Sequence, residues 1–444
     1  MLTPEESGQT DLWDLGRMKM TSLDRRGLLL GGAGLMSLAA LPALARIAVQ
    51  PPASAGFTAA GVADLNAQMH ALVDQQKLAG VVTLLARKGK VVNLDAYGKQ
   101  DASASTPMAV DSIFRIASMT KPVTGVAMMQ LWEQGRWKLD DPVARHIPEF
   151  AGLKVKTAAG LVDQTKPMTM AQLMSHTAGF GTSGVYEGAK VNLRETDLQG
   201  MVDKLAKLPL ESQPGTDWAY GPCVDLQGYV VQKLSGKSLD RYFQDHILTP
   251  LKMPDTQFWV DPTKTARVVR VHTYDAAGKI IPDPAAEALP PERRLPTRPP
   301  RFLAGGGGLF STAPDYYRFC QALLQGGELE GARVLKPDTV KLMRKSVLQP
   351  GVGVDLYGPV QKGLGFGMDF AVNERPDESG LPHGQDSYWW GGAFGTWFWI
   401  DPTHDVVFVG MIQNVRGSIP GGGTPDVRSI SPKAVYAALS DRKG

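Results

Sequence analysis

The chain is poor in residues that bind metals or form cross-links. Its 444 residues include two cysteines, Cys223 and Cys320, whose wide separation fits no metal or redox spacing. We interpret them as buried free thiols, with pairing in an oxidising compartment as the alternative. The seven histidines are scattered without a His-x-x-x-His or similar cluster. We therefore expect no metal site and no cofactor.

An excess of one charge is also missing. The chain has 47 Lys and Arg against 44 Asp and Glu, a formal net charge of +3, and no long basic run. Nucleic acid is therefore not an expected partner. The absence of a Gly-x-Ser-x-Gly sequence disfavours an ordinary α/β-hydrolase. The remaining composition, 43% apolar and 20% charged, is that of a soluble globular protein long enough for a large core and two lobes.

The first 45 residues have the pattern of an export signal. Arg25 and Arg26 precede an uncharged stretch, 28–45, that is rich in Leu, Ala and Gly and ends in Ala-Leu-Ala. This pattern predicts a twin-arginine-type signal over residues 1–45 and a periplasmic or secreted protein. A membrane anchor that stays attached is the alternative, because the stretch is at the short edge of spanning length. After removal of the signal we expect no stable membrane insertion.

A hydroxyl and an amine stand three residues apart at Ser118 and Lys121. In a helix this spacing is about one turn, so both groups face the same way. A serine hydroxyl needs a base to become a good nucleophile, and a lysine can be that base when burial or positive charge destabilises its ammonium. Pro122 requires the helix to begin close to Ser118, which leaves an amide free to bind a developing oxyanion. Taken alone, this spacing is weak evidence, since helix surfaces carry it by chance.

Strand patterns stand at the two ends of the chain, with helical patterns between them. Residues 80–86 and 91–97 predict a hairpin, and residues 396–400 and 406–412 predict two more strands. A segment at 281–300 is too rich in proline for regular structure.

This order predicts an α+β fold. We expect a discontinuous sheet domain over 56–150 and 300–440, and an inserted, mostly helical lobe over 151–299 that includes the proline-rich loop.

Several motifs together give a family resemblance. Four segments resemble the serine β-lactamase-related family in order and spacing: Phe114-Arg-Ile-Ala-Ser-Met-Thr-Lys-Pro122, Leu139-Asp-Asp-Pro142, Leu173-Met-Ser-His-Thr-Ala-Gly179 and Gly305-Gly-Gly-Gly-Leu-Phe-Ser-Thr312. The resemblance is to class C β-lactamase-like proteins. It implies a β-lactamase/penicillin-binding-protein-like fold, with an antiparallel sheet flanked by helices.

The resemblance implies three elements of an active site. Beside Ser118 and Lys121, it implies that Tyr220 is a general base and acid, because a phenol beside an ammonium ionises more readily. The third element is a strand that here resembles Trp390-Gly-Gly-Ala393. Its Ala393 amide would complete an oxyanion hole with the Ser118 amide.

Departures from the family pattern bear on the substrate. Pro222 stands two residues after the tyrosine where Tyr-x-Asn is common, and Trp390 stands where a lysine often precedes Thr-Gly. Both changes favour a less charged, small-molecule ester and resemble the carboxylesterase branch, or family VIII esterases. We expect Trp390, Gly391, Gly392 and Phe394 to contact this ester. The sequence indicates no oligomeric state.

Three other functions stay open. They are a β-lactamase or D-Ala-D-Ala carboxypeptidase-type penicillin-binding enzyme, an acyltransferase of the same family, and a catalytically inactive binding protein.

Weaker candidates surround these residues. We expect a structural hydrogen bond from His176, and either a bracing or a solvated carboxylate at Asp225. The glycines at 305–308 predict a close approach of backbone near the pocket. Arginines in the proline-rich segment predict a loop over the pocket entrance, or else a plain surface loop.

Overall fold

The computed structural model describes residues 47–181, 193–194, 196–355, 359–415 and 426–441. Residues Ile47–Gly444 form one compact unit. The predicted export signal at 1–45 lies outside the described residues and stays a prediction. Within the described part of the chain, no helix has both the length and the apolar character needed to cross a membrane.

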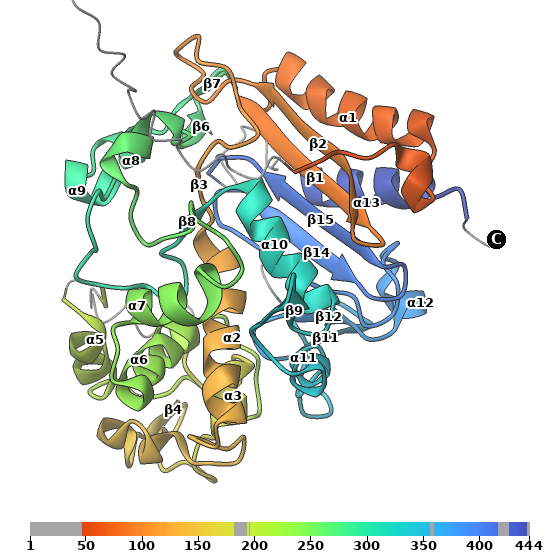
Figure 1. The fold of residues 1–444 in the computed structure, drawn as a ribbon. Coiled ribbons are helices and arrows are strands. Elements are labelled where there is room, and N and C mark those ends of the chain that lie inside the picture. The colour runs from red at the N-terminus through yellow and green to blue at the C-terminus, as the bar shows by residue number, and fades with distance from the viewer. Residues whose placement is uncertain (1–46, 182–192, 195, 356–358, 416–425, 442–444) are drawn as a thin grey trace, which may run out of the picture. The chain divides into compact units, whose positions relative to one another are not determined.

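A seven-stranded antiparallel sheet is the centre of this unit (Figure 1). Its strands, in spatial order, are β11 (Leu364–Phe366), β12 (Ala371–Asn373), β13 (Tyr388–Gly391), β14 (Trp397–Asp401), β15 (Val406–Met411), β1 (Gly80–Arg87) and β2 (Lys90–Gly98). The predicted hairpin is confirmed as β1 and β2, and the two predicted C-terminal strands as β14 and β15. The C-terminal strand β15 lies between β14 and β1, so the two ends of the chain meet in the middle of the sheet.

Short two-stranded ladders lie outside this sheet. They are β3 (Phe114–Arg115) with β8 (Phe310–Ser311), β4 (Val155–Thr157) with β5 (Gly160–Val162), β6 (His272–Tyr274) with β7 (Ile280–Pro282), and β9 (Glu328–Leu329) with β10 (Ala332–Arg333). The β3–β8 ladder immediately precedes Ser118 and joins it to the chain that follows the glycine run.

Helices cover both faces of the sheet and form a separate group beside it (Figure 1). They are α1 (Ala59–Asp74), α2 (Thr120–Glu133), α3 (Met170–Met174), α5 (Leu198–Leu205), α6 (Cys223–Ser235), α7 (Leu239–Phe243), α8 (Pro284–Glu287), α9 (Pro291–Arg294), α10 (Ala313–Leu324), α11 (Pro337–Met343), α12 (Pro376–Ser379) and α13 (Val427–Ala437). Helices α1 and α13 pack together, whereas α10 packs against β15, β1 and β14.

Strand β1 explains why both faces need a cover, because all eight of its residues are buried. Its side chains alternate in direction. Leu84 belongs to the large core that includes α2 and α10, whereas Leu85 belongs to the core under α1 and α13. A strand that is apolar on both faces must lie between two layers.

Helix α2, the helix that follows Ser118, is buried almost throughout. Only its last two residues are partly exposed, and it packs against α6 and α7. The division into a sheet domain and a helical lobe stays a prediction, because Ile47–Gly444 cluster as one unit.

The proline-rich segment differs from the expectation. Residues 281–300 contain the end of β7 and the one-turn helices α8 and α9. Proline is compatible with the first turn of a helix, because the backbone N–H groups there make no hydrogen bond within the helix that proline would remove. Asp283 also caps α8, because its Oδ2 accepts a hydrogen bond from the Ala286 amide at 3.1 Å. The prediction that this segment is too proline-dense for regular structure is therefore wrong.

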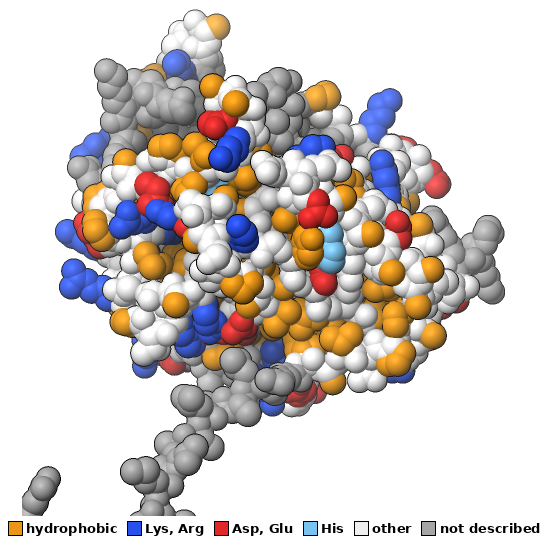
Figure 2. All heavy atoms as spheres, turned by 90° about the horizontal axis from the view of Figure 1, so that it is seen from above, with side chains coloured by type: hydrophobic (Ala, Val, Ile, Leu, Met, Phe, Trp, Pro, Cys, Tyr) orange, Lys and Arg blue, Asp and Glu red, His pale blue; other side chains and the backbone are white. Residues whose placement is uncertain are grey.

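The surface mixes charges of both signs. The face drawn in Figure 2 shows Lys and Arg scattered among Asp and Glu, with apolar side chains between them. On the described part of that face, no extended basic area is visible.

Candidate active site

Ser118 lies in a strained turn at the start of α2. Residues Ala117–Met119 form a single 3-10 turn that leads directly into the helix, which confirms that the helix begins close to Ser118. Ala117 has a φ of +44°, an unfavourable value for a residue with a Cβ atom. Ala117 and Met119 are buried, whereas Ser118 is partly exposed. Backbone strain of this kind is concentrated at functional sites, where the surrounding structure holds it.

Lys121 is buried one turn further on. Its Nζ lies 3.4 Å from Ser118 Oγ and donates a hydrogen bond of 2.5 Å to the Gly306 carbonyl oxygen. Only 5% of its surface is exposed. The predicted spacing therefore brings the hydroxyl and the amine together.

The glycine run at 305–308 crosses close to α2 and α6. A Cβ atom on Gly305 would lie 2.8 Å from the Val224 carbonyl oxygen, so this position requires glycine. The predicted close approach of backbone is confirmed.

Asp225 binds the residue that accepts the hydrogen bond from Lys121. Its Oδ1 accepts a hydrogen bond of 2.7 Å from the backbone N–H of Gly306, and the carbonyl oxygen of the same residue accepts from Lys121. The carboxylate is 6% exposed and has a longer contact, 3.4 Å, with Arg194. Of the two interpretations, the structure bears out the bracing carboxylate.

Tyr220 lies next to Lys121. The Lys121 Nζ is 4.5 Å from the centre of the tyrosine ring. The Tyr220 hydroxyl accepts a hydrogen bond of 3.3 Å from Trp390 Nε1. The hydrogen bonds of the described residues include none between the Tyr220 hydroxyl and Ser118. Ser118, Lys121 and Tyr220 therefore meet around Lys121.

Aromatic side chains form the wall behind Tyr220. The ring of His176 lies 5.0 Å from that of Tyr220, 5.9 Å from Trp218 and 5.5 Å from Phe366. The expected structural hydrogen bond from His176 is not found, because neither ring nitrogen has a partner among the described residues. Burial, assisted by the Lys121 charge, lowers the pKa of His176 well below its usual value. The imidazole is therefore a neutral packing group.

The predicted oxyanion residue Ala393 lies in a turn rather than on a strand. Strand β13 ends at Gly391, and Gly392 and Ala393 begin the turn to β14. This corrects the expectation that the whole Trp-Gly-Gly-Ala segment is a strand. The turn closes when the Gly392 amide donates to the Thr396 carbonyl at 2.7 Å.

This turn is fixed against the segment that carries Ser118. Thr396 Oγ1 donates to the Ile116 carbonyl oxygen at 3.2 Å. A Cβ atom on Gly392 would lie 2.4 Å from that same oxygen. Ala393 is exposed at the tip, while Trp390 is only 5% exposed and its ring lies tilted against that of Tyr220, with the ring centres 5.4 Å apart. The oxyanion role of the Ala393 amide and the substrate contact of Trp390 stay predictions.

Asp369 is a buried carboxyl that sequence reasoning missed. It is fully buried, has a φ of +64°, and accepts a hydrogen bond of 3.1 Å from Gln227 Nε2. Its other oxygen has no partner among the described residues and lies against Gly125 of α2. Burial raises the pKa of Asp369 well above its usual value, against the opposing effect of Lys121. No sequence motif marks it, since it follows Lys121 by more than half the chain.

A cavity of about 300 Å³ lies between β3 and the proline-rich segment. Arg115 and Phe394 line it together with Leu289, Arg294 and Leu295. The proline-rich segment thus lines a cavity with Phe394, one of the residues expected to contact a substrate. Trp390 is not among its lining residues.

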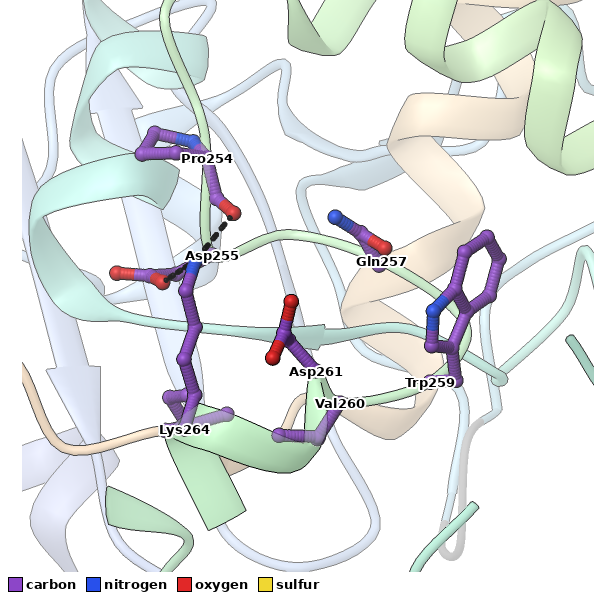
Figure 3. A pocket seen from close by; sticks show the side chains of 8 residues that line it. Pro254, Asp255, Gln257, Trp259, Val260, Asp261 and Lys264 are labelled. Atoms are coloured by element: carbon purple, nitrogen blue, oxygen red, sulfur yellow. Dashed lines mark hydrogen bonds and ion pairs between the residues drawn. The ribbon is translucent and has the colours of Figure 1, made fainter. Parts of the chain in front are cut away.

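A second, much smaller cavity of about 10 Å³ lies beside the loop at 254–264 (Figure 3). Two of its charged groups neutralise each other, because Lys264 pairs with Asp255 at 2.7 Å, and Lys264 also donates to the Pro254 carbonyl at 3.0 Å. Its volume is about that of one water, which makes it unsuited to a substrate.

The two cysteines are free and buried. This confirms their interpretation as buried thiols, and burial raises the pKa of Cys223 to about 12. Among the described residues, no group of three or more His, Cys, Asp or Glu side chains could hold a metal ion.

An antiparallel sheet flanked by helices, with a serine and a lysine paired at the start of a buried helix, defines the fold class of β-lactamases and penicillin-binding proteins. A family model described as Beta-lactamase matches residues 65–420. The chain therefore belongs to the beta-lactamase family.

Relatives of this chain include esterases. Esterase EstB of Burkholderia gladioli is 31% identical over 363 residues, which cover 76% of this chain and 87% of that protein. Protein Rv1367c of Mycobacterium tuberculosis is 34% identical over 402 residues, covering 84% of this chain and 98% of that protein. The solved structure of EstCE1, a hydrolase with promiscuous acyltransferase activity, has a TM-score of 0.73 at 25% identity and covers 85% of this chain and 98% of that one. The protein is thus a beta-lactamase-fold enzyme of a serine hydrolase family with esterase and acyltransferase homologues.

Proposed function

We propose that the protein is a serine esterase that cleaves small carboxylic esters through an acyl-enzyme on Ser118. The observation that carries this proposal is the position of Lys121 Nζ, which lies 3.4 Å from Ser118 Oγ and 4.5 Å from the centre of the Tyr220 ring. The similarity to esterase EstB of Burkholderia gladioli supports an ester as the substrate class.

The proposed reaction has two steps. In the first, Ser118 Oγ attacks the ester carbonyl carbon while Lys121 and Tyr220 take its proton and deliver it to the departing alcohol. The amides of Ser118 and Ala393 stabilise the negative oxygen of the tetrahedral intermediate. In the second step, a water loses a proton to the same base, attacks the acyl carbon and releases the acid, and Ser118 regains its proton. No cofactor takes part.

The contacts around Lys121 suit this role. Its Nζ donates to a neutral peptide carbonyl, Gly306, and burial raises the pKa of the Asp369 carboxyl, which interacts with the Lys121 charge, well above its usual value. A directly paired carboxylate would stabilise the ammonium form, and a base must be free to lose its proton. The Lys121 amine is therefore held in position by a hydrogen bond, and none of the described ion pairs includes it.

The first experiment compares p-nitrophenyl acetate and p-nitrophenyl butyrate with the chromogenic cephalosporin nitrocefin. We expect ester turnover by the wild type, a loss of at least about 1,000-fold in S118A, and little turnover of nitrocefin. Mass spectrometry of the wild type after rapid acid quenching should show the added acyl mass, and S118A should not.

The alternatives give different results in the same assays. Strong nitrocefin turnover would indicate a β-lactamase, and stable labelling by a fluorescent penicillin would indicate a penicillin-binding enzyme. Faster release of p-nitrophenol on addition of an alcohol, with formation of a new ester, would indicate an acyltransferase. The absence of any acylation by activated esters would contradict the proposal and favour a binding protein.

A further inference from the structure

The cavity of about 300 Å³ beside β3 is lined by two residues that stand close in the sequence to Ser118 and Ala393. Arg115, which lines it, comes three residues before Ser118, and Phe394, which also lines it, directly follows Ala393. The remaining wall comes from 265–271 and from the α8–α9 region (Figure 1). Its apolar members include Val268, Val271, Leu289 and Leu295.

Three arginines border this cavity, and two of them are neutralised. Arg270 Nη2 pairs with Glu287 at 2.8 Å and its Nη1 with Asp101 at 2.7 Å. Arg294 pairs with the same Glu287 at 3.3 Å. These two cations therefore share two carboxylates.

Arg115 is different. Among the described residues, no carboxylate lies within ion-pair distance of its guanidinium, and no described hydrogen bond starts from it. The only described contact of this group is with the face of the Phe310 ring, at 4.8 Å from its centre. Burial, with no acidic partner to offset it, lowers the pKa of Arg115 to about 10. Arg115 is partly buried, and a partly desolvated cation without a counter-charge is a ready site for an anion.

We propose that this cavity receives the carboxylate-bearing half of the ester substrate, with Arg115 as the group that binds the carboxylate. The inference rests on the proposed function and adds a substrate class, amphiphilic esters that carry one free carboxylate, in place of the less charged ester expected from Pro222 and Trp390. A guanidinium presents two parallel N–H donors that match the two oxygens of a carboxylate. The valines, leucines and Phe394 would cover the hydrocarbon part.

The position of the carboxylate, on the acyl or on the alcohol side, is separated by two pairs of substrates. The acyl pair is p-nitrophenyl hydrogen adipate against p-nitrophenyl hexanoate, and the alcohol pair is 4-acetoxybenzoate against 4-acetoxybenzamide. In at least one pair, we expect kcat/KM to favour the anion by about 10-fold or more, the size of a hydrogen-bonded charge contact.

The test variant is R115Q, with R115K as the conservative replacement. R115Q should remove most of the preference for the anion. R115K keeps the positive charge but lacks the two parallel N–H donors of the guanidinium, so it should retain part of the preference. The matched control is R293Q, because Arg293 lies on the exposed side of α9 and does not line the cavity. R293Q removes the same charge and should leave the preference within about threefold, since exposed charges are screened by salt.

The failure of this inference can be told apart from the failure of the proposed function. Turnover of the neutral esters without preference for either anion, or a preference that survives in R115Q, would overturn the inference and leave the esterase intact. If no ester is turned over, calorimetry on S118A decides, with 4-hydroxybenzoate against 4-hydroxybenzamide and monomethyl adipate against methyl hexanoate. Tighter binding of the anion in one pair, lost in R115Q/S118A, supports the inference; equal affinity within both pairs overturns it.

Discussion

Replacing Asp225 tests whether one buried carboxylate fixes the position of Lys121. In D225A, the Gly306 amide loses the acceptor that now lies 2.7 Å away. A buried N–H without a partner costs about 1–3 kcal/mol, so we expect the free energy of unfolding to fall by this amount. Because the carbonyl oxygen of the same residue, Gly306, accepts from Lys121 at 2.5 Å, a displacement of Gly306 should also move the amine. A shift of about 1 Å can cost about 100-fold in rate, and we expect kcat to fall by about 10- to 100-fold.

Urea denaturation and p-nitrophenyl butyrate hydrolysis measure the two effects separately. D225N is the informative companion, because its side-chain oxygen can still accept from Gly306, so it should keep most of the stability and at least about a third of the rate. D203A on the neighbouring helix α5 removes an exposed carboxylate and should change stability by less than about 0.5 kcal/mol. Unchanged kcat in D225A, or equal damage in D225N and D225A, would refute the hydrogen-bond chain from Asp225 to Lys121.

Two further predictions concern acid stability and the turn after β13. Burial lowers the pKa of His383 to about 4, so below pH 6.5 this residue binds a proton in the unfolded chain but not in the folded chain. The contribution of His383 to the free energy of unfolding should therefore decrease by about 2 kcal/mol between pH 7 and pH 5. Urea denaturation at both pH values checks this, and a slope equal in H383F and the wild type would contradict it. G392A should reduce ester turnover by more than about 10-fold and destabilise the fold by about 1–3 kcal/mol, because a Cβ atom there would lie 2.3 Å from Thr396 Oγ1. The control is G307A, whose Cβ would have its nearest neighbour at 3.7 Å; a G392A enzyme as active and stable as G307A would show that the turn is not held in place.

Local spacing was enough to predict the parts of the site that lie within one turn of each other. Ser118 and Lys121 face the same way because they are three residues apart on a helix. The start of α10 has a similarly local cause, since Thr312 Oγ1 accepts from the Asp315 amide at 3.2 Å. In each case the physical cause acts between near neighbours and leaves a mark in the sequence.

Contacts between distant segments left no comparable mark. The bracing role of Asp225 depends on a backbone N–H 81 residues further along the chain. Asp369 is also far in the sequence from Lys121, with whose charge it interacts in the folded chain. The strained φ of Ala117 depends on what surrounds it rather than on the alanine itself. His176 matched a motif, yet its ring nitrogens are enclosed by aromatic rings whose proximity only the folded chain creates.

The pairing of β15 with β1 has a consequence for synthesis of the chain. Val82 is paired with Met411, so the hairpin made first cannot join its central partner until the chain has been synthesised through residue 411. Until then, the backbone N–H and C=O groups along one edge of β1 are unpaired, and this strand, with apolar side chains on both faces, can pair with strands of other chains. A chain shortened before Val406 would leave that edge permanently unpaired and should aggregate, although it would still contain Ser118, Lys121 and Tyr220. Pairing of β15 thus completes the seven-stranded sheet, and a premature stop shortly before Val406 would be as damaging as one far earlier in the chain.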